Sequence, residues 1–197
     1  LLRHVMPEAR ALVGANLSQF FSSPIAQPLL ARMRSSNPQL DSLAQAAGLD
    51  LERNLTEMLV AAPAGGKQNI GVVLLRGAFD AARLSTSAAN AGARLQRYRG
   101  VSVISSGQET EAWFALLDGA TAALGDPTSV RGVIDRLGSG DGAPPELLSL
   151  AGRYSREYDF WAVSIVPPSE MASASTAQQL GGILQGDILR SVVETGG

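Results

Sequence analysis

The sequence predicts an α+β fold in which an antiparallel sheet carries helices packed mainly on one face. Apolar runs with the alternation of strands are interspersed with segments of helical spacing, and short glycine-containing turns join neighbouring strands. The order of apolar blocks and breakers in residues 11–63 also recurs without a gap in residues 115–167. We therefore expect two repeated strand–helix–hairpin units, the first over residues 1–107 and the second, truncated at its C-terminus, over residues 108–197.

Six segments have the composition or alternation of β-strands. They comprise residues 11–17, 55–62, 70–76, 100–106, 112–117 and 158–166. Gly65-Gly66 lies between the second and third segments and predicts a β-hairpin from Leu55 to Arg76. Asp118-Gly119 predicts a type I′ turn into a short strand at residues 121–124, because aspartate and glycine tolerate positive φ.

Helices are predicted at matching points of the two units. Ser23 and Asp126 each precede a proline, and such pairs are typical of helix N-termini. The first helix carries apolar residues at helical spacing as far as Met33, and the second ends at Gly138. Further helical signals are the shared face of Val130, Val133, Ile134 and Leu137, the alanine-rich residues 79–92, and a short helix near residues 147–152.

The end of the chain departs from the repeat after a Pro/Ser/Ala linker at residues 167–175. We prefer a short helix over residues 176–185, followed by the delayed hairpin strand at residues 187–195. The alternative is one continuous helix from Leu180 to Val193. Three glycines within that span would each destabilise such a helix by about 1 kcal/mol, which favours the first interpretation.

The segments around Trp113 and Trp161 are apolar on both faces, unlike a strand of a sheet that has one face in water. Phe160 and Trp161, for example, point to opposite sides of the same segment. Either both segments are central strands that are covered on both sides, or their second face lines a ligand groove or a subunit interface. We expect the buried core to include Trp161, Val163, Leu116, Leu59, Leu30 and Ile134.

Composition excludes several classes of function. Hydrophobic residues make up 45% of the chain and charged residues 17%, which is ordinary for a globular protein. The net charge of −2 shows no basic excess, so we expect no nucleic-acid partner. No apolar run predicts a transmembrane segment, and no cysteine is present for a disulfide or a thiolate metal site. The chain opens at Leu1, which leaves open that a signal peptide or lipid anchor precedes it.

The sequence offers few groups for catalysis. His4 is the single histidine and lies at the start of the chain, where we expect fraying, and no common hydrolase, metalloenzyme or phosphate-loop motif is matched. We therefore expect no catalytic residues, no metal site and no cofactor. Two carboxylate pairs, Glu109 with Glu111 and Glu157 with Asp159, are the remaining route to acid–base chemistry, because residues two apart on a strand share a face. Solvated charges on an exposed edge are the simpler interpretation.

A basic cluster of Arg94, Arg97 and Arg99 flanks Tyr98. Arginines around an aromatic ring can hold a phosphate or a nucleobase. They are more often the polar side of an edge strand, where charges discourage aggregation. Together with the two apolar segments, the cluster predicts a binding surface that includes Trp113, Trp161, Phe160, Arg97 and Arg99.

The order of strand, capped helix, short helix and hairpin carries a resemblance. With the turn Leu117-Asp118-Gly119 running into Ala123-Leu124-Gly125-Asp126-Pro127, it resembles a class of exported bacterial proteins of unknown function that are built from duplicated α+β units. The resemblance covers residues 9–167. It implies a periplasmic or lipoprotein-anchored setting, with the cytoplasm as the alternative, and supplies no active-site residues.

These observations predict a non-enzymatic exported binding module. Its partner would be another protein or an envelope component, with a second copy of the chain as a further candidate. One alternative is a periplasmic carrier that holds an apolar small molecule between sheet and helices. The other is a hydrolase that uses paired carboxylates. An apolar cavity would favour the carrier, and a cleft with converging acids would favour the hydrolase.

Overall fold

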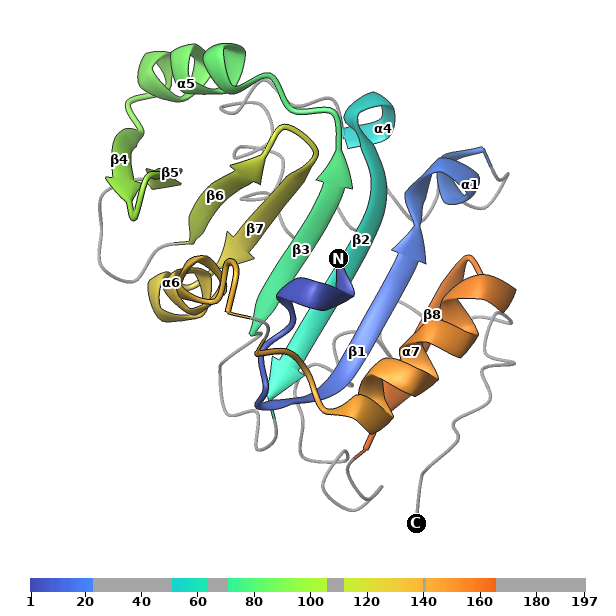
Figure 1. The fold of residues 1–197 in the computed structure, drawn as a ribbon. Coiled ribbons are helices and arrows are strands. Elements are labelled where there is room, and N and C mark those ends of the chain that lie inside the picture. The colour runs from blue at the N-terminus through green and yellow to red at the C-terminus, as the bar shows by residue number, and fades with distance from the viewer. Residues whose placement is uncertain (23–50, 64–70, 106–111, 140, 166–197) are drawn as a thin grey trace.

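The computed structural model describes residues 1–22, 51–63, 71–105, 112–139 and 141–165. Their strands form one antiparallel sheet of eight strands in the order β4-β5-β6-β7-β3-β2-β1-β8, which confirms the predicted α+β fold (Figure 1). The strands are β1 (Ala9–Asn16), β2 (Leu55–Pro63), β3 (Val72–Gly77), β4 (Arg94–Tyr98), β5 (Val101–Ser105), β6 (Trp113–Asp118), β7 (Thr121–Gly125) and β8 (Phe160–Ser164).

Helical segments lie before, between and after groups of these strands. Their bounds are η1 (Leu2–His4), α1 (Leu17–Phe21), α4 (Leu51–Asn54), α5 (Ala81–Asn90), α6 (Pro127–Asp135) and α7 (Pro145–Glu157). The two longest described helices are α5 and α7, and the predicted short helix near residues 147–152 is the middle of α7. The helix predicted from Ser23 to Met33 and the elements predicted after residue 167 lie outside the described residues.

Both hairpins predicted from turn residues are present. In the first, β2 pairs with β3 so that Leu59 lies opposite Leu74. In the second, β6 pairs with β7, but the predicted type I′ turn is wrong because Gly119 does not have a positive φ. Instead, the carboxylate of Asp118 accepts a hydrogen bond from the backbone N–H of Ala120 at 2.8 Å. This side-chain turn reverses the chain without left-handed backbone.

The hairpin of β4 and β5 contains the type I′ turn that the sequence analysis did not expect. Tyr98 lies opposite Val101, so only Arg99 and Gly100 form the loop. Their φ angles are 48° and 85°, and a two-residue loop with positive φ at both positions is the type I′ geometry. Arg99 is the one non-glycine residue with positive φ among those that the structure describes.

Helix α6 begins where the Asp126-Pro127 pair predicts. The Asp126 carboxylate accepts hydrogen bonds from the backbone N–H groups of Thr128 and Ser129, at 2.9 and 3.0 Å. The predicted apolar face is buried, with one exception: Leu137 lies beyond the last helical residue and is 38% exposed. The helical spacing stops applying at Asp135, so Leu137 is no longer directed at the sheet.

The repeated units are not confirmed. Residues 17–21 form helix α1, whereas residues 121–125 at the equivalent position of the proposed repeat form strand β7. Strand β1 lies directly beside β2, but their proposed equivalents β6 and β8 are separated in the sheet by four other strands. An alternating apolar pattern predicts that a strand is buried, and it does not specify the neighbouring strand. Strand β8, from the second proposed unit, extends the sheet beside β1 of the first.

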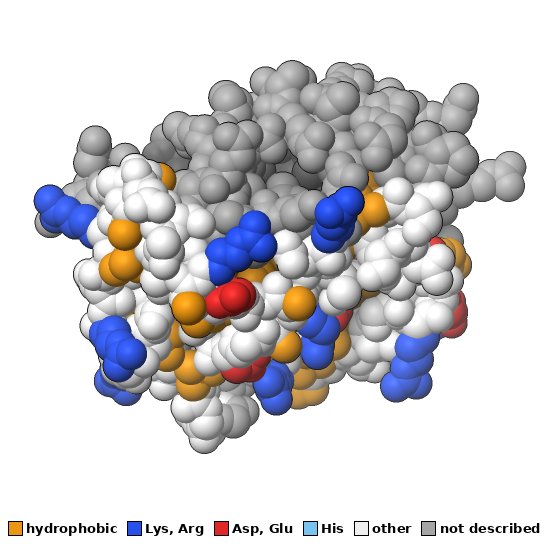
Figure 2. All heavy atoms as spheres, turned by 90° about the horizontal axis from the view of Figure 1, so that it is seen from above, with side chains coloured by type: hydrophobic (Ala, Val, Ile, Leu, Met, Phe, Trp, Pro, Cys, Tyr) orange, Lys and Arg blue, Asp and Glu red, His pale blue; other side chains and the backbone are white. Residues whose placement is uncertain are grey.

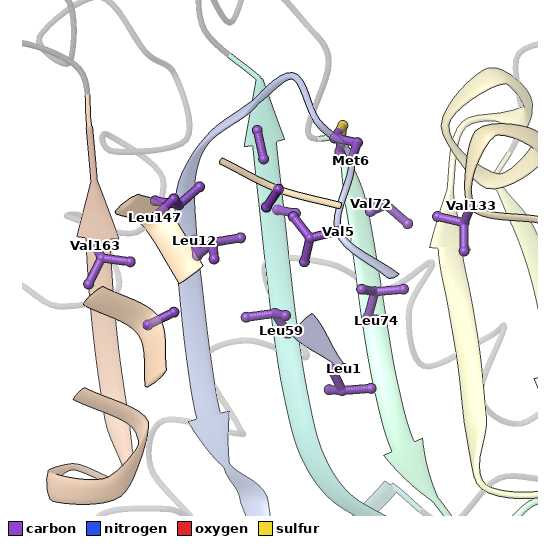
Figure 3. Close-up of a cluster of buried hydrophobic side chains, with 14 of the residues drawn as sticks. Leu1, Val5, Met6, Leu12, Leu59, Val72, Leu74, Val133, Leu147 and Val163 are labelled. Atoms are coloured by element: carbon purple, nitrogen blue, oxygen red, sulfur yellow. The ribbon is translucent and has the colours of Figure 1, made fainter. Parts of the chain in front are cut away.

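One side of the sheet, which we call the α7 face, is covered by α6, α7 and the first six residues of the chain (Figure 1). Figure 3 shows Leu12, Leu59 and Leu74 from three neighbouring strands in one cluster with Leu1 and Val5 of the N-terminal segment. The other side, which we call the α5 face, contains a separate cluster. Its buried members are Ala15, Leu17, Leu55, Leu75, Phe79, Leu84, Phe114 and Ala122.

Most of the predicted core is confirmed. Trp161, Val163, Leu59 and Ile134 are buried, Leu116 is only partly buried, and Leu30 lies outside the described residues. Strand β6 is an interior strand, as its two apolar faces predict. Strand β8 is instead an edge strand of the described sheet, and its second face is only partly covered. On that face Phe160 is 39% exposed and Ala162 is also exposed, whereas Ser164 at the end of the strand is buried.

The N-terminal segment is packed, which corrects the expectation of a frayed start. Leu1 is 8% exposed, Val5 is fully buried, and His4 is 9% exposed. Because Leu1, Val5 and Met6 supply apolar surface directly over the centre of the α7 face, burial of these side chains holds the segment on the sheet (Figure 3).

Candidate binding surface

The structure divides the predicted binding surface between opposite edges of the sheet. Arg97 and Arg99 belong to the β4–β5 hairpin, and Trp113 lies on β6 near that end. Phe160 and Trp161 lie on β8, which is the other edge of the sheet. The five residues therefore do not form one continuous surface.

Trp161 is part of the core. It lies opposite Gly14 of β1 in the strand register and is 8% exposed. The indole occupies the space that a side chain at position 14 would need, because a Cβ atom there would overlap Cε2 and Cζ2 of the ring. Phe160 points to the other face of β8 and remains exposed.

Trp113 is covered by an arginine of α6. The guanidinium carbon of Arg131 lies 4.6 Å from the Trp113 ring centroid and 5.8 Å from that of Tyr98. Both distances are within the range of a cation–π interaction. Trp113 itself is 7% exposed, so Arg131 and Tyr98, rather than the indole, form the surface at this end.

One carboxylate on α6 ties the β4–β5 hairpin to the helix. The Tyr98 hydroxyl donates to one oxygen of Asp135 at 3.2 Å, and Nε of Arg99 lies 2.8 Å from the other oxygen. An exposed ion pair of this kind contributes little stability by itself. Together with the bond from Tyr98, it joins the β4–β5 hairpin to α6. Arg131 and Asp135 were not predicted as site residues, although their spacing of four on a predicted helix is a signal for neighbouring opposite charges.

The remaining cations of β4 have no acidic partner among the described residues. Neither Arg94 nor Arg97 forms an ion pair there, and both are exposed, together with Leu95 at 46%. We call residues 94–99 the β4 edge. Across the whole face of the molecule that Figure 2 shows from above, separate basic side chains stand among hydrophobic ones, and acidic side chains are fewer. The edge-strand interpretation of this cluster is confirmed by the sheet order.

In the part of the chain that the structure describes, the groups with potential acid–base chemistry do not converge. Nε2 of His4 accepts a hydrogen bond from Nε of Arg3 at 3.0 Å. Glu157 ends helix α7 and Asp159 lies in the connection to β8, so the expectation that this pair shares a strand is wrong. Both side chains are exposed. Glu109 and Glu111 lie outside the described residues.

Burial gives His4 a predictable effect on stability. Burial, and then repulsion from Arg3, lower the pKa of its imidazole below the ordinary value of 6.5. The unfolded chain therefore binds a proton more readily, and stability falls as the pH drops below about 6.5 until it reaches the folded pKa. We expect the urea midpoint to fall less between pH 7 and about pH 5 in His4→Gln than in the original protein. Parallel pH profiles of the two proteins would contradict this assignment.

The described residues contain neither a candidate metal site nor a candidate membrane-spanning helix. In the five described ranges, no group of three or more histidine, cysteine, aspartate and glutamate residues is arranged to hold a metal ion. No helix within those ranges is long and apolar enough to cross a membrane.

In comparisons with known proteins, this chain is similar to solved structures in its fold. No protein-family model and no curated protein matches the sequence. Crystal form I of TP0453 is similar in structure, with a TM-score of 0.52 and 12% identity over 77% of this chain. Crystal form III of TP0453 has a TM-score of 0.51 and 12% identity over 75% of this chain. This chain spans 56% of the length of either structure, and at such identity the likeness shows the fold alone.

Proposed function

We propose that this protein is a non-enzymatic exported module that binds another protein or an envelope component through the β4 edge. The observation that carries the proposal is an open edge strand on which Arg94 and Arg97 have no acidic partner among the described residues and Leu95 is exposed. The hairpin is also held in place by its bonds to Asp135, so the surface exists before a partner arrives.

Two further arguments support the non-enzymatic and exported parts of the proposal. The single histidine is buried and already accepts a hydrogen bond from Arg3, so it is not presented to a substrate as a base. The resemblance of residues 9–167 to exported bacterial proteins favours a periplasmic or lipoprotein-anchored setting.

The test follows the fluorescence of Trp113 during titration with purified envelope proteins and with phosphatidylglycerol vesicles. Trp161→Phe leaves Trp113 as the only tryptophan, and its neighbours Tyr98 and Arg131 connect it to the β4 edge. We expect a saturable change with an envelope component, lost in Arg97→Glu and retained in the matched charge reversal Arg156→Glu. Arg156 is also exposed, but it lies in the last turn of α7.

A carrier of an apolar ligand is the second candidate, favoured by the α5 face. Apolar side chains there are only partly buried, among them Met58, Val73, Ile104, Leu116 and Leu124. Saturation by a fatty acid with no response to any envelope component would favour the carrier. Turnover of a generic ester or glycoside that disappears in Glu157→Gln would instead favour a hydrolase.

A further inference from the structure

We propose that the β4 edge binds an acidic, extended peptide segment of a partner protein as a ninth, antiparallel strand of the sheet. This inference rests on the proposed function and specifies its partner and mode of binding. It depends on three features of residues 94–99: the direction of the free backbone groups, the side chains on each face, and the charge.

The strand register shows which backbone groups of β4 are free. Tyr98 and Val101 flank a two-residue turn, and residues in that position exchange both of their backbone hydrogen bonds. Hydrogen-bonded and non-hydrogen-bonded residue pairs alternate along an antiparallel ladder. Leu95 and Arg97 therefore belong to non-hydrogen-bonded pairs, and their N–H and C=O groups point away from β5. No backbone hydrogen bond from a turn, loop or cap in the described residues reaches either of them. Two adjacent donor–acceptor pairs are therefore available to an added strand.

The side chains of the edge alternate in chemistry. Leu95 lies opposite Ile104, which belongs to the α5 face, so Leu95 and Arg97 share that face. Arg94, Gln96 and Tyr98 lie on the α7 face. In strand addition the main chain supplies affinity, and alternate side chains supply specificity. The β4 edge thus offers one apolar contact and one cation on the first face and a second cation on the other.

Charge selects an acidic partner. Asp135 is already paired with Arg99, and Arg131 already lies over the rings of Trp113 and Tyr98. Arg94 and Arg97 remain without an acidic partner in the described part of the chain. A second copy would bring the same arginines to the contact, and like charges close together across strands are unfavourable. The opposite edge of the sheet, β8, carries no charged residue and has no such preference.

The register also specifies a pattern for the partner. An antiparallel strand places an acidic residue opposite Arg97, an apolar residue opposite Leu95 two positions later, and a second acidic residue opposite Arg94 at the next position. The recognised motif is therefore four consecutive residues of the partner: an acidic residue, any residue, an apolar residue and a second acidic residue. The hairpin is held by Asp135, so little ordering is required of the protein on binding.

The experiment uses the full chain and the blocked hexapeptide Thr-Glu-Thr-Val-Glu-Thr. Calorimetry measures its affinity, and amide hydrogen exchange by NMR measures the protection of the N–H groups of Leu95 and Arg97. We expect protection of both amides, and affinity at least about tenfold weaker in Arg97→Glu but unchanged in Arg156→Glu. A peptide with lysine in place of both glutamates should not bind.

A second pair of variants separates the backbone from the side chain. Leu95→Pro removes the outward N–H, and proline is tolerated on an edge strand where that group makes no sheet bond. Leu95→Ala removes the side chain only. We expect the proline variant to bind the peptide more weakly than the alanine variant. Circular dichroism verifies that both variants are folded.

Each other outcome overturns the inference in a distinct way. Binding without amide protection, or equal affinity of the proline and alanine variants, would show an acidic partner that does not add a strand, and the proposed function would stand. No peptide binding while an envelope component still changes Trp113 fluorescence would also overturn the inference alone. Failure of both assays would overturn the inference and the proposed function together. A concentration-dependent dimer that is lost in Arg97→Glu would identify a second copy as the occupant.

Discussion

Replacing Trp161 with alanine is expected to lower the free energy of unfolding by about 3–5 kcal/mol. The side chain is 8% exposed and belongs to the same buried cluster as Val163 of its own strand and Tyr154 of α7. A domain has a total stability of only about 5–15 kcal/mol, so the loss is a large part of it. Urea unfolding followed by circular dichroism measures the change.

The matched control lies on the same strand. Phe160 is also a large aromatic residue of β8, but it points to the other face of the strand and is 39% exposed. Phe160→Ala should therefore change the urea midpoint much less than Trp161→Ala. Equal effects of the two substitutions would show that the indole contributes no more to the core than an exposed ring.

Gly14→Ala is expected to lower stability by about 1–3 kcal/mol, because the added methyl group has no space. Its Cβ would lie 2.6 Å from Nε1 of Trp161, and closer still to two carbons of the ring. The effect should depend on the tryptophan. In the Trp161→Ala background the space is empty, and the same substitution should cost about 0.5 kcal/mol or less. Additive losses in the double variant would contradict a direct contact.

Helix starts and turns could be predicted from the sequence, because they are determined by residues that are adjacent in the chain. Asp126 and Pro127 start α6 because capping and a preset φ act within one turn of helix. Asp118 and Gly119 located a hairpin, although the turn type was wrong because the aspartate side chain supplied the closing hydrogen bond. The burial pattern of β6 was likewise readable from its two apolar faces.

Long-range pairing was not predictable in the same way. Strands β2 and β8 have similar apolar patterns, yet β2 pairs with both β1 and β3, whereas β8 pairs with β1 alone within the described residues. This difference places β8 at an edge and leaves Phe160 exposed.

The candidate site was only partly predictable for a related reason. The arginines around Tyr98 are adjacent in sequence and were identified together as an edge strand. Their partners Arg131 and Asp135 come from α6. In the sequence, strands β5, β6 and β7 lie between β4 and that helix. The distance between the two tryptophans could not be known before the strand order was established, because only that order places β6 and β8 far apart.

The pairing of β1 with β8 has a consequence for how the chain folds. Leu12 of the first strand meets Val163 of the last described strand, and closing so long a loop slows folding. During synthesis β1 emerges early and can pair with β2, while its other side stays uncovered until residues 160–164 have been made. An unfinished chain therefore presents a free strand edge that can pair with other chains and aggregate. Among the described strands, the last one to leave the ribosome is therefore the one that covers this edge of β1.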